Sequence, residues 1–304
     1  MASNQNGMTT TTNAPFIPTI IANQALGRLG AYLNLGRTVT KDADLTSVQV
    51  GETIQVPVRG SLSSNSLSQN SDVTVQTPTS TSKSITLDTH KEVTISELDY
   101  LASVAQGGSS LPGYVEDAVQ VLAEDIETAL AGLWSQATVN RDYSGTIVND
   151  IVDIRKDLIM AKVPTFAEKF GYLHPSTSAR ILKANAFIDP KIIPNNQALT
   201  EGAAGRVEGF DIFEGQLVVK SGSPGVYRNM FYTKDAMVLA SRPQPQVAAG
   251  LGAQSGTAID GNGIALRVIR SYNPNKLAVQ ITLDVVFGVG TLRPDHLVVL
   301  DDTF

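Results

Sequence analysis

The chain has 304 residues, of which 42% are hydrophobic, so it is long enough for about two domains with substantial cores. It carries 29 acidic and 23 basic side chains, for a formal net charge of -6. No cluster of Lys or Arg exceeds two adjacent residues, so sequence-independent binding to nucleic-acid backbones is disfavoured. The absence of cysteine excludes disulfides, thiolate catalysis and cysteine-ligated metal sites, and fits synthesis in the cytosol.

The N-terminal region is expected to begin disordered and to continue as a helix. Residues 1–13 (MASNQNGMTTTTN) are polar and low in complexity, and they lack the basic leader and apolar run of a signal peptide or anchor. No segment approaches the roughly 20 apolar residues that span a bilayer, so no membrane partner is expected. Within 15–35, apolar residues spaced by four predict a short amphipathic helix, namely Ile21, Ala25, Leu29 and Leu33.

The next region is informative because it lacks aromatic residues. No Phe, Tyr or Trp occurs between Tyr32 and Tyr100, although alternating apolar and polar residues in 53–59 and 84–88 predict two strands. The mainly Ser, Thr, Asn and Gln sequence of 60–84 between them indicates a long, thin, two-stranded ribbon; its composition alone also allows a disordered linker. A lone ribbon is marginally stable in water, so it needs another surface to lie on.

Residues 112–137 are predicted to form the longest helix, because apolar residues recur every three or four positions and Pro112 suits the first helical position. The other face of this helix carries five carboxylates, Glu116, Asp117, Glu124, Asp125 and Glu127. No Lys or Arg occurs between Lys91 and Arg141, so these carboxylates are expected to lack local partners. The acidic face is either simply solvated or a surface that repels a polyanion by like charge.

From residue 149 onward the sequence predicts short alternating helices and strands, as an α+β or α/β layer requires. Helices are expected at 151–162 and 177–184, the second capped by Ser176. The stretch 244–263 is rich in small residues and is interpreted as a loop. The predicted strands are 170–174, 207–213 paired with 216–220, 229–240, 264–271, 278–289 and 297–300.

The sequence predicts no catalytic, cofactor or metal site. His90, His174 and His296 are far apart and outside any zinc-ligand spacing, and His174 is expected to be a packed or capped polar residue. The glycines of 250–256 miss the dinucleotide fingerprint by one residue and precede a strand instead of a helix. No serine lies in a nucleophile elbow.

Five segments form an ordered pattern along the chain. The run ITLDVVFGVGTLRPDHLVVL (281–300) combines a long strand, an R-P step and a short apolar strand. It is preceded by an arm-like segment (16–42), the sequence VGETIQVPV (50–58), a stretch of helix and strand residues (161–188) and a glycine-flanked hairpin (205–218). Each is weakly specific alone, but the ordered set resembles the major capsid proteins of tailed bacteriophages.

The resemblance implies the Hong Kong 97 fold, which is an α+β fold of four parts. These are an N-terminal arm at 1–47, an extended loop or E-loop at 48–98, a peripheral domain at 99–145 and 235–285 with a spine helix at 112–137, and an axial domain at 146–234 and 286–304.

The resemblance also implies a function. A protein of this family is not an enzyme and needs no cofactor; it is synthesised in the host cytoplasm and assembles with itself, as pentamers and hexamers, into an icosahedral shell around double-stranded DNA. Its expected partners are a separate scaffolding protein, because no fused scaffolding segment precedes the arm, a portal, a cement protein in some cases, and the packaged DNA by proximity without sequence-specific binding. Lys83 matches a crosslinking lysine in position, but no partner residue for it is identified.

Two sets of residues are predicted to carry this function. The apolar ribbon positions are expected to pack against the peripheral domain of another subunit, namely Ile54, Val56, Val58, Ile85 and Leu87. The acidic face of the spine helix is expected to line the shell interior, through Glu116, Glu124 and Glu127. The alternatives are a β-rich phage tail or adhesion component and an α/β enzyme whose site is not recognised.

Overall fold

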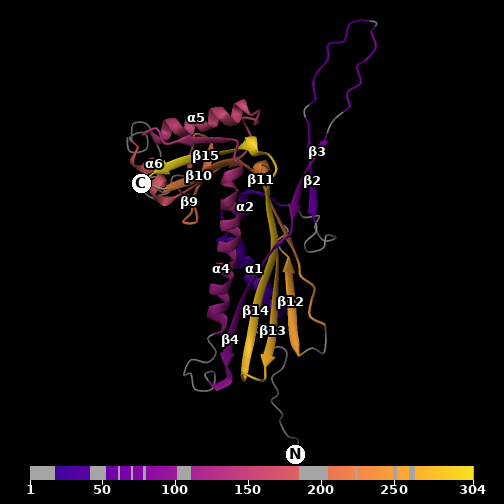
Figure 1. Ribbon diagram of the computed structural model, residues 1–304, viewed down its shortest axis with the longest axis vertical. Helices are drawn as coiled ribbons and strands as arrows, with labels where there is room; N and C mark the ends of the chain where they lie inside the picture. Colours follow the sequence, from indigo (N-terminus) through magenta and orange to yellow (C-terminus); the bar gives the residue numbers. More distant parts are fainter. Residues whose placement is uncertain are drawn as a thin grey trace, which may run out of the picture.

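A computed structural model of the chain shows helices and strands in an elongated body from which one ribbon projects (Figure 1). The segment 1–13, interpreted as disordered, lies outside the described residues. The structure describes residues 18–41, 53–60, 62–69, 71–77, 80–100, 111–184, 205–222, 225–248, 252–259 and 264–303.

A six-stranded sheet runs along the length of the body (Figure 1). Its order is β1-β11-β14-β13-β12, and β4 also pairs with β14. The central strand β14 pairs antiparallel with β4, β11 and β13, and its residues 283–288 are all buried, as expected for a strand covered on both faces. The bounds are β1 Thr40–Lys41, β4 Thr89–Leu98, β11 Met237–Arg242, β12 Ala253–Ile259, β13 Ala265–Asn273 and β14 Ala278–Thr291.

Two helices pack on this sheet and on each other. Helix α1 (Pro18–Tyr32) contacts β12 and β13, and α4 (Leu111–Ala131) contacts β4 and β14. The predicted apolar stripe of α1 is confirmed, because all four of its residues are buried, namely Ile21, Ala25, Leu29 and, directly after the helix, Leu33. The chain continues from α4 as a 3-10 turn, η3 (Gly132–Gln136), so the predicted long helix is also confirmed, with a tightened end.

A seven-stranded sheet lies across one end of the body (Figure 1). Its order is β5-β15-β10-β6-β8-β7, with β9 also paired to β10. Helices α5 (Ile147–Met160) and α6 (Pro175–Lys183) form a second core with this sheet. The strands are β5 Val139–Asp142, β6 Lys169–Leu173, β7 Arg206–Val207, β8 Phe210–Glu214, β9 Lys220–Ser221, β10 Val226–Thr233 and β15 Leu297–Thr303.

Three short turns connect these layers. The four-residue helix α2 (Leu35–Thr38) follows α1 and leads into β1. The 3-10 turn η4 (Lys234–Ala236) joins β10 of one sheet to β11 of the other, and η5 (Pro294–His296) joins β14 to β15. At η4 and at η5, therefore, the chain passes from one sheet to the other through a tight turn.

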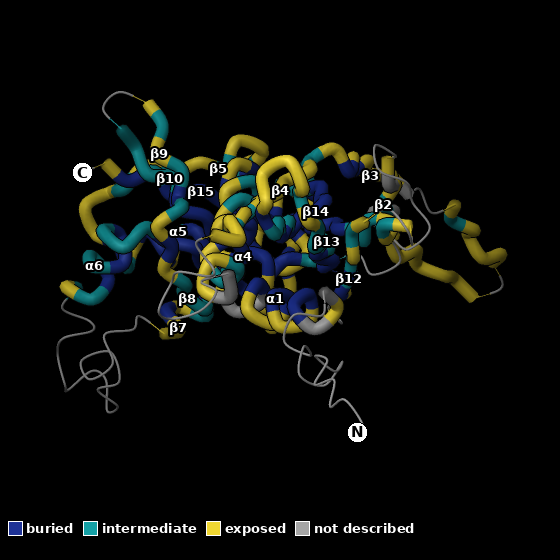
Figure 2. Tube along the Cα trace, turned by 90° about the horizontal axis from the view of Figure 1, so that it is seen from below, coloured by how far each residue is buried: buried dark blue, intermediate teal, exposed yellow. Residues whose placement is uncertain are grey.

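The predicted ribbon is confirmed as an antiparallel pair. Strand β2 (Thr53–Arg59) pairs with β3 (Ser80–Thr86) in a separate two-stranded sheet, with Thr53 opposite Thr86 and Arg59 opposite Ser80. Beyond this pair the chain extends away from the body (Figure 1). We call residues 60–79 the extended-loop tip; most of its described residues are exposed, as the tube coloured by burial shows (Figure 2).

The structure corrects three predictions about strands. The stretch 244–263, interpreted as a loop, contains β12, which pairs along its whole length with β13. The segment 216–220 does not pair with 207–213; instead β7 and β8 form a hairpin, and β9 pairs with β10. The stretch 229–240 is not one strand, because η4 divides it between the two sheets.

Two helix ends also differ from the prediction. Helix α5 begins at Ile147, one turn earlier than expected. The cap of α6 is His174, whose Nδ1 accepts the backbone N–H of Ser176 at 3.2 Å, so the prediction of Ser176 as the cap is wrong. The prediction that His174 is a packed or capped polar residue is confirmed by its packing, because its ring stacks on Tyr227 with centroids 3.8 Å apart.

Candidate assembly surfaces

The base of the ribbon, where β3 leads into β4, packs against other strands of its own chain. Ile85 is 3% exposed and Leu87 is fully buried, and both belong to a cluster with apolar side chains of β11 and β14. Val56 packs against the same cluster. The prediction that Ile85 and Leu87 reach another subunit is therefore wrong, because their own chain already covers them. The side chains of Ile54 and Val58 lie outside the described part of the structure.

Two glycines of β14 make this attachment possible. A Cβ atom added to Gly288 would collide with the backbone oxygen of Thr86, and one added to Gly290 would lie 3.1 Å from a side-chain carbon of Ile85. The ribbon can approach β14 this closely only because both positions lack a side chain. The fixed base aims the rest of the ribbon away from the body.

The extended-loop tip presents apolar side chains to solvent. Four of them are more than half exposed, namely Leu62, Leu67, Val73 and Val75. The two limbs of the tip are joined by Gln76, which accepts the backbone N–H of Ser63 at 3.1 Å and donates to its carbonyl oxygen. Exposed apolar groups on a projecting ribbon are typical of a surface that is covered by a partner.

The acidic face of α4 is only partly as predicted. Glu116 forms an ion pair with Arg28 of α1, and Asp125 lies 3.6 Å from Lys91 of β4, so both carboxylates have cationic partners although none is local in the sequence. The cations come from elements that are distant in sequence. Glu124 is exposed and accepts a hydrogen bond from Gln120 at 2.9 Å. Glu116 and Glu124 thus stay on a solvent-facing surface.

Glu127 does not belong to that surface. Its side chain is 3% exposed, and its two carboxylate oxygens accept the backbone N–H groups of Leu35 and Gly36, each at 3.0 Å. These are the first two N–H groups of α2, which lack intrahelical partners, and Asn34 provides no side-chain cap there. The prediction that Glu127 lines an acidic face is wrong, since it caps α2 instead.

Burial sets the ionisation of the groups around this contact. It raises the pKa of Glu127, and the backbone donors of the arm partly oppose this shift. It also raises the pKa of Tyr172 and Tyr232 above the ordinary value of 10.0, so both phenols stay protonated in alkaline solution as well. The hydroxyls of Tyr232 and Thr38 lie 2.5 Å apart, which adds a contact between α2 and β10.

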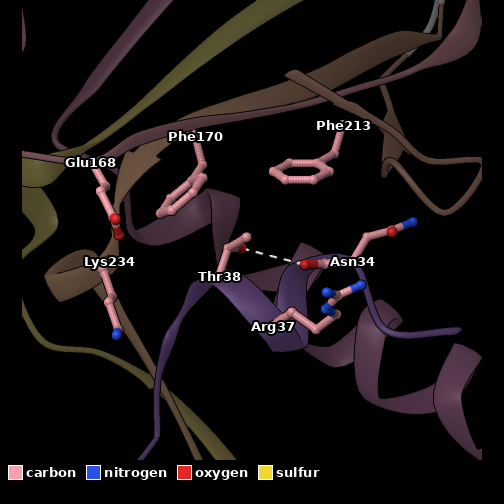
Figure 3. Close-up of a pocket in the computed structure, with 7 residues that line it drawn as sticks. All are labelled: Asn34, Arg37, Thr38, Glu168, Phe170, Phe213 and Lys234. Atoms are coloured by element: carbon pink, nitrogen blue, oxygen red, sulfur yellow. Dashed lines mark hydrogen bonds between the residues drawn. The ribbon is translucent and has the colours of Figure 1, made fainter. Parts of the chain in front are cut away.

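A small cleft of about 240 Å³ lies beside this joint (Figure 3). Figure 3 shows the rings of Phe170 and Phe213 on one wall and residues of α2 opposite them. The cleft therefore marks the place where α2 meets the start of β6 and the end of β10. It is lined by Asn34, Arg37, Thr38, Glu168, Phe170, Phe213 and Lys234.

Two partly buried ion pairs hold the last strand. Arg228 pairs with Asp301 and lies over the ring of Trp134, 4.6 Å from its centroid. Asp302 is fully buried, accepts the hydroxyl of Thr177 at 3.0 Å and lies 3.2 Å from Arg180. Sequence reasoning missed these contacts, because adjacent acidic residues give no indication of the cations that face them.

The described residues show no cluster of three or more His, Asp or Glu side chains suited to a metal ion. Among the helices that the structure describes, none is long and apolar enough to cross a membrane. His90 pairs with the buried Asp284 at 2.9 Å, and Asp284 is also bound by Arg267. His90 therefore joins the start of β4 to the central strand β14.

In sequence, the chain matches no protein-family profile and no curated protein. In structure it is similar to solved phage capsids. The capsid of cyanophage P-SCSP1u matches with a TM-score of 0.64 at 12% identity, covering 86% of this chain and 85% of that one. The capsid of a native GTA particle matches with a TM-score of 0.63 at 13% identity, covering 90% and 91%. The mature capsid of bacteriophage PhiM1 gives 0.60 at 12% identity, covering 88% and 85%.

These matches extend over most of both chains, so the similarity is not confined to a single motif but includes both sheets. The chain has the Hong Kong 97-type fold of phage major capsid proteins. The predicted α+β fold and the predicted resemblance are confirmed at the level of the fold.

Proposed function

We propose that the chain is a major capsid protein that assembles as pentamers and hexamers into an icosahedral shell around double-stranded DNA. The observation that carries this proposal is the extended-loop tip, which leaves the body with four exposed apolar side chains. An element that cannot bury its apolar groups within its own chain stabilises an oligomer when a second copy covers them. The same fold occurs in solved structures described as capsids, one of them computed with five-fold symmetry.

The proposed role is structural and not enzymatic. The exposed acids of α4, Glu116 and Glu124, are assigned to the inner surface, where like charge limits the adhesion of packaged DNA. The net charge of -6 agrees with a shell that encloses DNA without binding it tightly. The further partners we expect are a separate scaffolding protein, a portal and, on the outer surface, a cement protein. The protein is assigned to the virion capsid after its synthesis in the host cytoplasm.

Electron cryomicroscopy of the chain co-expressed with its scaffolding protein tests this proposal. Closed shells with five-fold vertices are the expected product, and nuclease-protected DNA is expected inside shells that also carry the portal. Fibres or tail-like tubes would support the alternative of a β-rich tail or adhesion component. A chain that stays monomeric with scaffolding protein present contradicts the shell assignment.

A further inference from the structure

The turn between α5 and β6 presents a second exposed apolar surface. Phe166 is 92% exposed and Met160 is 75% exposed, and Val152 and Ile159 on the outer side of α5 are also exposed. We call these four residues the α5–β6 patch. The opposite side of α5 fills the second core, so the patch is an additional apolar face of the helix and not an extension of that core.

A buried lysine orders the turn that carries Phe166. Lys169 is 3% exposed, and its ammonium group donates to the carbonyl oxygens of Thr165 at 2.9 Å, Ala167 at 3.1 Å and Pro164 at 3.5 Å. Three backbone groups on both sides of Phe166 are thus fixed to one side chain. An exposed aromatic residue on a preorganised loop loses little conformational entropy when a partner covers it, which favours a role as an interface anchor.

The arrangement of the chain points to the occupant of this patch. The extended-loop tip projects from the same end of the long axis at which α5 lies, but from the opposite flank (Figure 1). The view along the long axis also places the ribbon and α5 on opposite sides (Figure 2). When copies stand side by side in a head-to-tail ring, the tip of one copy faces the α5 flank of the next.

The two surfaces also match in chemistry. The tip has apolar side chains of moderate size and a single charged residue, Asp72. The α5–β6 turn offers Phe166 as a large apolar anchor and carries two exposed charges, the cation Lys162 and the anion Glu168. An ion pair between Asp72 and Lys162 at the edge of the apolar contact fixes its register more than it raises its affinity.

We propose that the extended-loop tip of one copy docks on the α5–β6 patch of the neighbouring copy, with Phe166 as the anchor. This contact rests on the proposed function, and it assigns the receiving surface to the α5 flank instead of the long sheet. The receiving surface is set within one chain by Lys169, so it exists before assembly.

Cysteine pairing tests the contact directly, because the natural chain has no cysteine. Phe166→Cys is combined in turn with Leu67→Cys, Val73→Cys and Val75→Cys, and particles are assembled reduced and then oxidised. At least one pair should give a ladder of linked subunits on non-reducing gels, at a yield at least about tenfold above that of either single variant.

The matched control combines Val75→Cys with Tyr114→Cys. Tyr114 is also an exposed aromatic residue, but it lies near the start of α4 at the far end of the body (Figure 1). This pair should not form a ladder. Normal particles in which none of the three Phe166 pairs links subunits would overturn the contact and leave the shell assignment intact. Failure of the unmodified chain to form any particle would overturn both.

A second measurement does not depend on disulfide geometry. Phe166→Ala removes the anchor but leaves Lys169 and its carbonyl partners in place, so the isolated subunit should unfold as before. Assembled shells of this variant should dissociate at a lower denaturant concentration than shells of the unmodified chain. Equal dissociation midpoints for the two kinds of shell would contradict the role of Phe166.

Discussion

The carboxylate of Glu127 on α4 accepts the backbone N–H of Gly36 at 3.0 Å, which fixes α2 to α4. The second oxygen holds Leu35 in the same way. A helix of four residues has little stability of its own, and α2 has no side-chain cap. A single buried carboxylate therefore supplies the cap and determines where the chain passes from α1 to β1.

Replacing this carboxylate should loosen the arm. In Glu127→Ala the N–H groups of Leu35 and Gly36 lose their acceptors in a buried place, so we expect a loss of about 2–4 kcal/mol in the free energy of unfolding. Urea denaturation followed by circular dichroism measures this loss. Glu124→Ala is the matched control, because Glu124 lies one turn earlier on the exposed side of α4, and its effect should stay within about 0.5 kcal/mol. Equal effects of the two substitutions would show that Glu127 is not a structural cap.

Gly288 should be intolerant of any side chain. In Gly288→Ala the new methyl group meets the backbone of Thr86, so either β3 or β14 must shift, at a cost of about 1–3 kcal/mol. Thermal unfolding should show this loss, and a protease that cuts the ribbon should act faster. Gly27→Ala is the control, because a Cβ atom there meets nothing within 4 Å; in the interior of α1 it should stabilise the chain by about 0.5–1 kcal/mol. A neutral Gly288→Ala would mean that the base of the ribbon is not held as closely as the structure shows.

The His174 cap should make the subunit sensitive to acid. Burial lowers the pKa of His174 below its ordinary value of 6.5, with Lys220 adding to the effect. The folded chain then binds fewer protons than the unfolded chain, so the contribution is fully present above pH 6.5 and is lost as the pH falls through the folded pKa. Protonation of Nδ1 also removes the acceptor for the N–H of Ser176.

His174→Asn isolates this effect, since asparagine caps helices well and does not titrate. The unmodified chain should lose more stability than the variant between pH 7 and pH 5, measured as the change in urea midpoint. His296, whose pKa is also lowered by burial, remains in both proteins, so the difference between them reports His174 alone. Identical pH profiles for the two proteins would contradict the assignment.

Regular apolar spacing was enough to predict the helices of the long body and the strands of the ribbon. Each of these helices buries one repeating set of side chains, as Leu29 does in α1 and Leu122 does in α4. Strand β12 was missed because its small residues, including Gly256, look like a loop in isolation. Its strand character comes from pairing with β13 and from contact with α1, which are tertiary effects.

The candidate surfaces were harder to predict for the same reason. The sequence placed Glu127 with the exposed acids because its partners are backbone groups more than 90 positions away, and backbone donors leave no trace in residue types. It also assigned Ile85 to a neighbour, because nothing in the alternation of β3 indicates that Gly290 opens space for it. The exposed tip residues, by contrast, follow directly from a polar stretch with isolated apolar positions.

Removing the extended-loop tip should separate folding from assembly. Deleting 62–77 leaves four residues between Arg59 and Ser80, which suffice for a hairpin turn that keeps β2 paired with β3. Because the removed apolar side chains are exposed within the subunit, its free energy of unfolding should change by no more than about 0.5 kcal/mol.

Shells, however, should be absent or unstable, as judged by sedimentation and electron microscopy. A full-length variant with serine in place of the four apolar tip residues distinguishes the two roles of the tip, since it keeps the length of the loop and removes only the apolar groups. If apolar contact drives assembly, this variant should fail as the deletion does. Normal shells from the deletion variant would contradict the function proposed for the extended loop, whatever the serine variant does.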